Sequence, residues 1–239
     1  MYGHRCSTIL KSCFHMKESD KISILVCCHS NDHEHDMLLQ AALESLTRQT
    51  YQNFETVLVL DECREGTKWI AEPYRDILSL KIHERSHKQG LAMAKNFGLA
   101  RCTGQWVAYL DADDQWMDCK LELQRNFLLE NENTDFVFCE VWDNYAGTLT
   151  PNCFKIGQYE THAAIAAAMP RENVVCHGSA LIRKLAIDSL GGYSTDRLLL
   201  GREDWDLWQR AIANGFHFYK IPERLYIYGM GTSVVRGEV

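Results

Sequence analysis

Hydrophobic residues along the first half of the chain fall into two alternating patterns. Short apolar runs rich in β-branched and aromatic side chains are typical of strands buried in a parallel sheet, and they occupy residues 22–27, 56–61, 79–84, 106–111 and 135–141. Between several of these runs, apolar residues recur at helical spacing and predict helices with one buried face, at residues 37–49, 90–102 and 120–131. This alternation predicts an α/β fold with a doubly wound, mostly parallel sheet and helices on both faces.

The second half of the chain is less regular. An Ala-rich helical stretch within 148–170 stops at Pro170, and a strand-like segment, ALIR, follows at 180–183. A short helix is predicted at 203–215, because acidic residues occupy its first turn and Gly215 is suited to close it. No repeat or low-complexity linker interrupts the sequence, so we expect a single domain from residue 21 onward, after an N-terminal extension at 1–20.

Composition narrows the classes of protein that fit this pattern. The 239 residues are 46% hydrophobic and 24% charged, as in globular proteins with a real core. No stretch reaches the ~18 apolar residues of a membrane span, and the N-terminus lacks the apolar segment of a signal peptide, so a cytoplasmic protein is expected. The ten Cys are scattered and are expected to be reduced. A net charge of −7 gives no basic footprint for nucleic acid.

Three carboxylates directly follow the predicted strand at 106–111: Asp111, Asp113 and Asp114. Ligands of doubly wound sheets bind at the carboxyl ends of the strands, where Asp61 also lies. Neighbouring carboxylates raise one another's pKa, whereas a divalent cation favours their charged forms. Mg²⁺ or Mn²⁺ takes one or two protein carboxylates and shares its other positions with water and substrate phosphates. The cluster therefore predicts a site for Mg²⁺ or Mn²⁺; the alternative is an acidic surface loop.

Four segments in a fixed order, taken together, point to a family. They are ISILVCCHSN, LLQAALESLTRQTYQNFETVLVLDE, HKQGLAMAKNFGLARCTGQWVAYLDADDQW and GREDWDLWQRA. From residue 21 to about 228 the chain resembles family 2 glycosyltransferases of the Rossmann-like GT-A fold. The resemblance implies a nucleotide-binding half at 21–115 and an acceptor-binding half at 116–239. It also implies transfer of a hexose from a nucleoside-diphosphate sugar, with a UDP-sugar favoured, to an acceptor hydroxyl on a glycan, a lipid-linked molecule or a protein.

The resemblance assigns the donor site to residues in the first half. The first strand and its loop, with Cys27, Cys28 and His29, hold the nucleotide, and Asp61 contacts its base. The family has a pair of acids at this second position, and here the first is Leu60. The alternative for Asp61 is a turn-forming residue after a strand.

Asp111 and Asp113 match the family's Asp-x-Asp motif. Asp113 is expected to contact the metal directly, and Asp111 to contact the ribose or a metal-bound water, while Asp114 caps the next segment of the chain. Lys88 and Asn96, with Arg85, lie in the segment where the family places groups that approach the donor. Basic residues there suit phosphate, although Lys and Arg mostly occupy solvated faces.

Glu203 and Asp204 match the family's Glu-Asp pair, whose second residue is the catalytic base of inverting members. Such a base accepts the proton of the attacking hydroxyl. The competing interpretation is that acids suit a helix N-terminus through the helix dipole. His177 lies in a region that family members use for the acceptor, although a lone His is more often structural.

Two features depart from the family pattern. Many members place a metal-ligating His near the last strand, where this chain has Gly229 to Gly231, so fewer protein groups or weaker metal binding is expected. The chain also stops at Val239, which favours a single-sugar transferase over a polysaccharide synthase.

Three rival hypotheses remain open on the sequence alone. A zinc site from Cys27, Cys28, His29, His33 and His35 lacks the usual ligand spacing. A nucleotidyltransferase should carry a Gly-rich, basic loop after the first strand, but HSNDHEHD is acidic and has no Gly. A catalytically inactive nucleotide-sugar-binding or scaffold protein of the same fold is consistent with Leu60 and the absent His.

Overall fold

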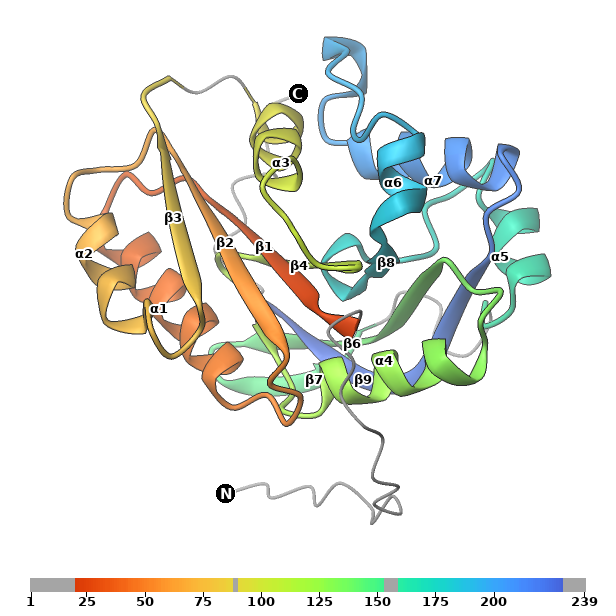
Figure 1. Cartoon of the computed structure of the whole chain (residues 1–239), viewed down its shortest axis with the longest axis horizontal. Coiled ribbons are helices and arrows are strands. Elements are labelled where there is room, and N and C mark those ends of the chain that lie inside the picture. Colours follow the sequence, from red (N-terminus) through yellow and green to blue (C-terminus); the bar gives the residue numbers. More distant parts are fainter. Residues whose placement is uncertain (1–19, 88–89, 153–158, 230–239) are drawn as a thin grey trace.

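The computed structural model describes residues 20–87, 90–152 and 159–229, and its strands form one continuous sheet (Figure 1). The strand order is β3-β2-β1-β4-β8-β6-β9-β5, and β7 pairs with β6 outside this path. The strands are β1 (Ile22–Cys28), β2 (Phe54–Asp61), β3 (Leu80–Arg85), β4 (Trp106–Asp111), β5 (Gln115–Trp116), β6 (Phe136–Tyr145), β7 (Thr148–Pro151), β8 (Leu181–Arg183) and β9 (Phe218–Gly229).

The first four strands of this order are parallel, as predicted from their apolar runs. Strand β1 pairs with β2 on one side and with β4 on the other, and β2 pairs with β3. All of β2 is buried, in keeping with a strand covered on both faces. The carboxyl ends of β1, β2, β3 and β4 therefore meet at one edge of the sheet.

The second half of the sheet is mixed. Strand β8 runs antiparallel to both β4 and β6, whereas β6 and β9 are parallel to each other. Register shifts between Cys139 and Val141 bend the β6–β9 pair, and short β5 joins β9 at the edge. The prediction of a mostly parallel α/β sheet is confirmed, with the antiparallel pairs confined to the half whose sequence is less regular.

Helices cover both faces of the sheet, as predicted (Figure 1). One core contains side chains from α1, α2 and α4, and the other contains side chains from α3, α5, α6 and α7. The helices are α1 (His33–Thr47), α2 (Thr67–Ala71), α3 (Leu91–Leu99), α4 (Lys120–Glu130), α5 (His162–Ala168), α6 (Lys184–Ser189) and α7 (Glu203–Ala213). Successive residues of β1 point to opposite faces of the sheet, so that Val26 packs in the first core and Leu25 in the second.

Local chemistry explains where helix α1 begins. The spacing of apolar residues predicts a start at Met37, but the helix begins at His33 because the Asp32 carboxylate accepts a hydrogen bond from the His35 amide at 2.9 Å. An N-cap of this kind satisfies an amide that has no partner inside the helix. The residues of the added turn are all polar, and Asp36 is buried nonetheless, so hydrophobic spacing does not mark this turn.

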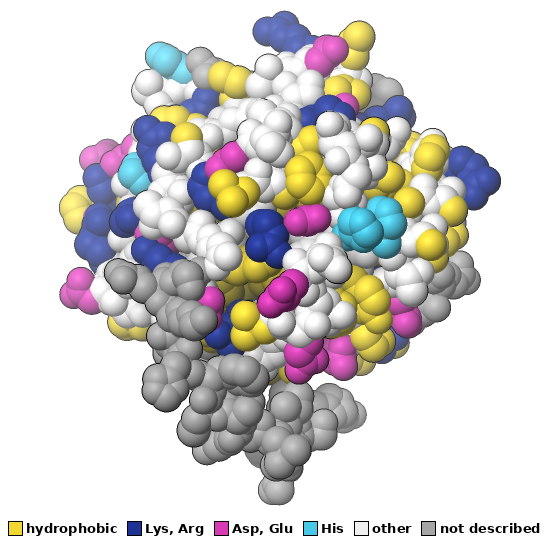
Figure 2. Space-filling view, turned by 45° about the vertical axis from the view of Figure 1, so that its right-hand side comes forward, with side chains coloured by type: hydrophobic (Ala, Val, Ile, Leu, Met, Phe, Trp, Pro, Cys, Tyr) yellow, Lys and Arg dark blue, Asp and Glu magenta, His cyan; other side chains and the backbone are white. Residues whose placement is uncertain are grey.

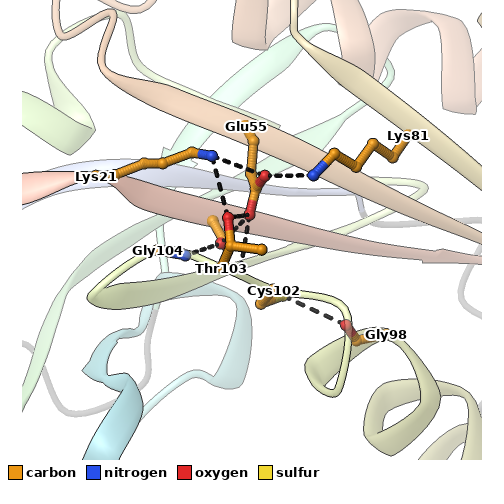
Figure 3. Close-up of polar contacts among 8 residues, drawn as sticks. Lys21, Glu55, Lys81, Gly98, Cys102, Thr103 and Gly104 are labelled. Carbon is orange, nitrogen blue, oxygen red and sulfur yellow. Dashed lines mark hydrogen bonds and ion pairs between the residues drawn. The ribbon is translucent and has the colours of Figure 1, made fainter. Parts of the chain in front are cut away.

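A buried carboxylate ties together the amino ends of the first strands (Figure 3). Glu55 on β2 is 1% exposed and accepts hydrogen bonds from Lys21 and Lys81 at 2.9 Å each. Ser23 and the Thr103 amide also donate to it, both at 2.7 Å. These donors hold the pKa of Glu55 well below its usual range, against the effect of burial. Glu55 and its donors Lys21, Ser23, Lys81 and Thr103 are called the Glu55 cluster below. The cluster lies at the opposite end of the strands from Asp61 and Asp111.

Candidate active site

The carboxyl ends of β1, β2 and β4 bring the predicted donor-site residues together. In the β1–β4 register Cys27 is the partner of Asp111, and in the β1–β2 register Cys28 is the partner of Leu60. His29 follows directly, and its Nδ1 lies 2.8 Å from the main-chain oxygen of Asp61. Lys88 lies outside the described residues.

Asp61 occupies a buried corner between β2 and β3. Its carboxylate forms an ion pair with Arg85 at 3.1 Å, and both side chains are less than a tenth exposed. Asp61 and Arg85 are partners in the β2–β3 register. A pocket opens beside this corner, lined by Leu60, Cys63, Arg64, Glu65, Lys68, Glu84 and Arg85. Of the pair, Arg85 lines this pocket and Asp61 lies behind it.

The cysteines at the end of β1 are unsuited to a shared zinc ion. They are consecutive strand residues whose side chains point to opposite faces: Cys28 belongs to one core, and Cys27 packs against the other. Burial raises the pKa of Cys27 to about 12, so the thiol stays protonated. Within the described ranges, no group of three or more His, Cys, Asp and Glu side chains is arranged to hold a metal ion. The structure therefore favours the core role of these thiols.

The acidic turn, defined here as Asp111, Asp113 and Asp114, follows β4. Burial, and then the charge of Asp111, raise the pKa of Asp113 from 3.8 to about 6. Burial and the charges of both neighbours also raise the pKa of Asp114 well above its usual value. The charge of His35 opposes the shift of Asp113, and hydrogen bonds from Tyr226 and the Gly229 amide oppose that of Asp114, but the pKa of each stays raised. The charged forms of Asp113 and Asp114 are therefore costly in the folded protein.

Asp114 does not cap a following helix, contrary to expectation. The residue is 2% exposed; its Oδ1 accepts a hydrogen bond from the Gly229 amide at 2.7 Å, and its Oδ2 accepts one from the Tyr226 hydroxyl. Tyr226 also donates to Asp111 at 3.4 Å. Helix α4 begins only at Lys120. Asp114 therefore anchors the acidic turn to β9, which leaves Asp113 and Asp111 as the carboxylates suited to a ligand.

These residues fit a hard divalent cation that has few protein ligands. Asp113 and Asp111 supply carboxylate oxygens, the donors that Mg²⁺ and Mn²⁺ prefer. Both are partly exposed, so water and substrate oxygens have access to them. The raised pKa of Asp113 indicates a group whose charged form lacks compensation within the protein. A cation bound there would remove the penalty.

Helix α7 begins with the second predicted pair of acids. Glu203 is 7% exposed, and its Oε1 lies 3.4 Å from the Nζ of Lys95 on α3. Asp204 is half-buried; its Oδ2 accepts a hydrogen bond from Asn173 at 3.0 Å and its Oδ1 accepts one from the Trp205 amide at 2.7 Å. Burial is the largest cause that raises the pKa of Asp204, and the positive charge of Lys95 opposes it. A carboxylate with a raised pKa is suited to accept a proton.

A chain of contacts connects the acidic turn with α7. A Cβ added to Gly178, in the short helix η3 (His177–Ser179), would lie 2.0 Å from the Tyr226 hydroxyl, so Gly178 makes room for the group that binds Asp114. The Nε2 of neighbouring His177 lies 2.8 Å from the Tyr193 hydroxyl, and the ring of Tyr193 lies 5.3 Å from the Nζ of Lys95. The acidic turn and the Glu203–Asp204 pair are thus connected by a series of contacts.

The structure gives Asn96 a defined partner. Its Nδ2 donates to the main-chain oxygen of Tyr193 at 2.8 Å, and its Oδ1 accepts from the Tyr193 amide at 2.9 Å. The predicted contact of Asn96 with the donor remains a prediction. Sequence reasoning did not single out Lys95, Tyr193 or Tyr226, whose partners lie about a hundred residues away along the chain. Only the proximity of Lys95 to Asn96 in a family motif offered a signal.

Comparisons with known sequences agree with the architecture of this site. The sequence model of glycosyl transferase family 2 matches residues 23–191, more than half of the chain. EpsE of Bacillus subtilis (strain 168) is 28% identical over 219 residues, which cover 88% of this chain and 73% of EpsE. The O-antigen biosynthesis glycosyltransferase WbnJ of Escherichia coli is 25% identical over 197 residues, covering 81% of this chain and 72% of WbnJ.

Solved structures share the fold. S. aureus TarS 1–349 in complex with UDP has a TM-score of 0.72 at 19% identity, over 87% of this chain and 60% of that chain. The mannosyltransferase PcManGT from Pyrobaculum calidifontis, in complex with GDP-Man and Mn²⁺, has a TM-score of 0.65 at 20% identity, over 86% of this chain and 56% of that one. This chain therefore spans about three fifths of the length of the solved structures it resembles. The fold is GT-A, and the chain belongs to glycosyl transferase family 2 and is a glycosyltransferase.

Proposed function

We propose that this chain is a metal-dependent, inverting glycosyltransferase that moves a hexose from a nucleoside-diphosphate sugar, with a UDP-sugar favoured, to an acceptor hydroxyl. The observation that carries the proposal is the acidic turn, where three carboxylates follow β4 and where burial and neighbouring negative charge raise the pKa of Asp113 and Asp114. PcManGT in complex with GDP-Man and Mn²⁺ and TarS in complex with UDP, both with the same fold, support a cation and a nucleotide as ligands of this chain.

Asp113 and Asp111 hold Mg²⁺ or Mn²⁺ in this proposal. The ion, when bound, neutralises the diphosphate and the charge that develops on it as the sugar leaves. Asp113 binds the ion directly, and Asp111 binds the ribose or a metal-bound water. Asp114 contributes indirectly, because its hydrogen bonds with Gly229 and Tyr226 fix the shape of the acidic turn.

The nucleotide occupies the carboxyl ends of β1 and β2. Cys27, Cys28 and His29 border it, and Asp61 recognises the base from its buried corner. The Asp61–Arg85 ion pair supports this role, since Arg85 fixes the carboxylate and adds donors of its own. Lys88 and Asn96 contact the donor in this proposal.

Asp204 is the general base. It accepts the proton of the acceptor hydroxyl while the oxygen forms a bond to the anomeric carbon, and the bond from that carbon to the diphosphate oxygen breaks on the opposite side, which inverts the configuration. Glu203 belongs to the same catalytic pair, and His177 lies on the acceptor side. The raised pKa of Asp204 supports a base of adequate strength.

The acceptor is a hydroxyl of a glycan, a lipid-linked molecule or a protein, and we expect the enzyme to act in the cytoplasm. Among the residues that the structure describes, no helix combines the length and apolarity needed to cross a bilayer. Lys and Arg side chains stand among Asp and Glu side chains on the face seen in Figure 2, and the net charge is −7. Neither feature favours a nucleic acid as partner.

Turnover with a panel of sugar nucleotides tests this function. UDP- and GDP-sugars are incubated with the enzyme in Mn²⁺, Mg²⁺ or EDTA, and release of the nucleoside diphosphate is measured. We expect one donor class to be hydrolysed slowly without an acceptor, only with metal, and not by Asp113→Ala. Binding of that donor without any turnover, with or without candidate acceptors, would instead support an inactive binding protein, the alternative with which Leu60 is consistent.

A further inference from the structure

We propose that Lys95 is a positioning residue for the transfer reaction: its ammonium group fastens helix α3 to the first turn of α7 and so orients Asp204 toward the acceptor. The inference rests on the proposed role of Asp204 as the base. It assigns a function to a buried cation that lies outside the proposed metal, nucleotide and base groups.

The contact between Lys95 and Glu203 joins two distant parts of the chain inside the protein. The ammonium and the carboxylate are 3.4 Å apart, and their side chains are 5% and 10% exposed. A buried charge is tolerated only when it is paired. Each therefore fixes the other, and a fixed Glu203 fixes the backbone of the next residue, Asp204.

Neighbouring contacts make this junction rigid. The Lys95 ammonium lies over the ring of Tyr193, 5.3 Å from its centroid, which is a favourable cation–π geometry. Asn96, the next residue of α3, holds the backbone of Tyr193 through two hydrogen bonds at 2.8 and 2.9 Å. Gly192 has φ of 74°, and a Cβ there would lie 2.5 Å from the Asn96 side chain, so the junction also requires glycine at this position.

The charges around Asp204 give the proposal a measurable signature. The positive charge of Lys95 lowers the pKa of Asp204, whereas the negative charge of Glu203 raises it. Hydrogen bonds from Asn173 and the Trp205 amide lower it as well. Tyr193 also faces this region and stays neutral, because burial raises its pKa well above 10. Lys95 and Glu203 thus act on the base with opposite sign.

This opposition separates a positioning role from a merely structural one. If the ion pair only stabilised the fold, loss of either partner would lower stability and leave the pH profile of the remaining activity unchanged. If the pair orients and tunes Asp204, Lys95→Met moves the acidic limb of the kcat profile to higher pH. Glu203→Gln moves that limb to lower pH, because it removes the negative charge that raises the pKa of Asp204 and leaves the positive charge of Lys95 in place.

The experiment measures kcat and KM between pH 5 and 9 for the wild type, Lys95→Met, Lys95→Arg, Glu203→Gln and the double variant. We expect kcat of Lys95→Met to fall by about 10²-fold, the cost of a misplaced catalytic group, with little change in the donor KM. Lys95→Arg keeps the charge and should keep the position of the acidic limb. Lys184→Met, which breaks the more exposed Lys184–Asp188 pair on α6, is the matched control and should change neither parameter.

The outcomes distinguish this inference from the proposed function. Asp204→Asn should abolish transfer while it leaves UDP binding intact; if it does not, the assignment of the base is wrong. If Asp204→Asn is inactive but the acidic limb is the same in Lys95→Met, Glu203→Gln and the wild type, the positioning role of Lys95 is overturned. Should Lys95→Met fail to fold, as judged by thermal unfolding, the nearly isosteric Glu203→Gln carries the test alone.

Discussion

Glu55 and the acidic turn lie at opposite ends of the same strands and have opposite surroundings. At the amino ends, Glu55 meets two lysines, a serine hydroxyl and a backbone amide, and its pKa is depressed (Figure 3). At the carboxyl ends, Asp113 has burial and the charge of Asp111 against it, and its pKa is raised. The folded protein thus stabilises the charged form of Glu55 and destabilises the charged form of Asp113.

The difference indicates how to distinguish an acid that stabilises the fold from an acid that is suited to bind a ligand. Glu55 and Asp114 are both buried, so burial alone does not distinguish the two kinds of acid. The direction of the pKa shift does, because it reports whether the folded protein compensates the charged form. The charged form of Asp113 is not fully compensated, and this residue lies at the edge of the sheet where doubly wound folds bind their ligands.

The largest expected difference between Asp113 and Glu55 is in the activity of their variants. Asp113→Asn removes a charged ligand of the ion, and we expect kcat to fall by about 10²- to 10³-fold, since metal catalysis supplies several kcal/mol. Glu55→Gln, measured at a temperature where it is folded, should keep the wild-type kcat. Steady-state assays with saturating Mn²⁺ make the measurement, and equal losses in both variants would remove the distinction.

The free energy of unfolding should fall in Glu55→Gln and not in Asp113→Asn. Glu55→Gln deletes the shared acceptor of Lys21 and Lys81, and we expect the free energy of unfolding to fall by about 3 kcal/mol, the lower end for breaking a buried pair because both lysines can reach water. Urea unfolding at pH 7.5 measures the change. A loss below about 1 kcal/mol would mean that the Glu55 cluster is not what holds these strand ends.

Asp113→Asn should stabilise the metal-free protein. Because the folded-state pKa is raised from 3.8 to about 6, the penalty of the charged form is fully present above pH 6 and disappears as the pH falls toward 3.8. We expect a gain of roughly 1–3 kcal/mol at pH 7.5 in EDTA, and a smaller gain at pH 5. Glu55 behaves oppositely, since its contribution is present above its unfolded value of 4.5 and is lost as the pH falls below it.

Urea unfolding of the wild type and Asp113→Asn at both pH values measures this gain. A destabilised Asp113→Asn in EDTA would show that the carboxylate is already compensated within the protein.

The smallest effect concerns the support of the acidic turn. Tyr226→Phe removes the hydroxyl that donates to Asp114 and Asp111, and we expect about 1 kcal/mol of destabilisation together with weaker metal-dependent binding of UDP. Tyr145→Phe, at a half-exposed tyrosine, is the control. Calorimetric titration with UDP in Mn²⁺ compares the two, and unchanged affinity in Tyr226→Phe would limit Asp114 to a role in stability.

The fold and the placement of the candidate residues Asp61 and Asp111 at one edge of the sheet could be predicted from local pattern. The apolar runs predicted the strands, and their ends placed Asp61 and Asp111 at one edge, because parallel strands align their carboxyl ends. The partners of Asp114 and Glu203 could not be predicted, because Tyr226 and Lys95 are more than a hundred residues away from them. Such partners are set by the packing of the second half of the sheet, where the sequence pattern is weakest.

The most direct test of a cation at the acidic turn is the position of manganese in a crystal of the enzyme soaked with Mn²⁺ and UDP. We predict an anomalous scattering peak within coordination distance, about 2.0–2.2 Å, of an Asp113 carboxylate oxygen, with the diphosphate on its other side and the Glu55 cluster unchanged. UDP bound at this edge without a metal peak, or manganese bound away from Asp113, would contradict the proposed site.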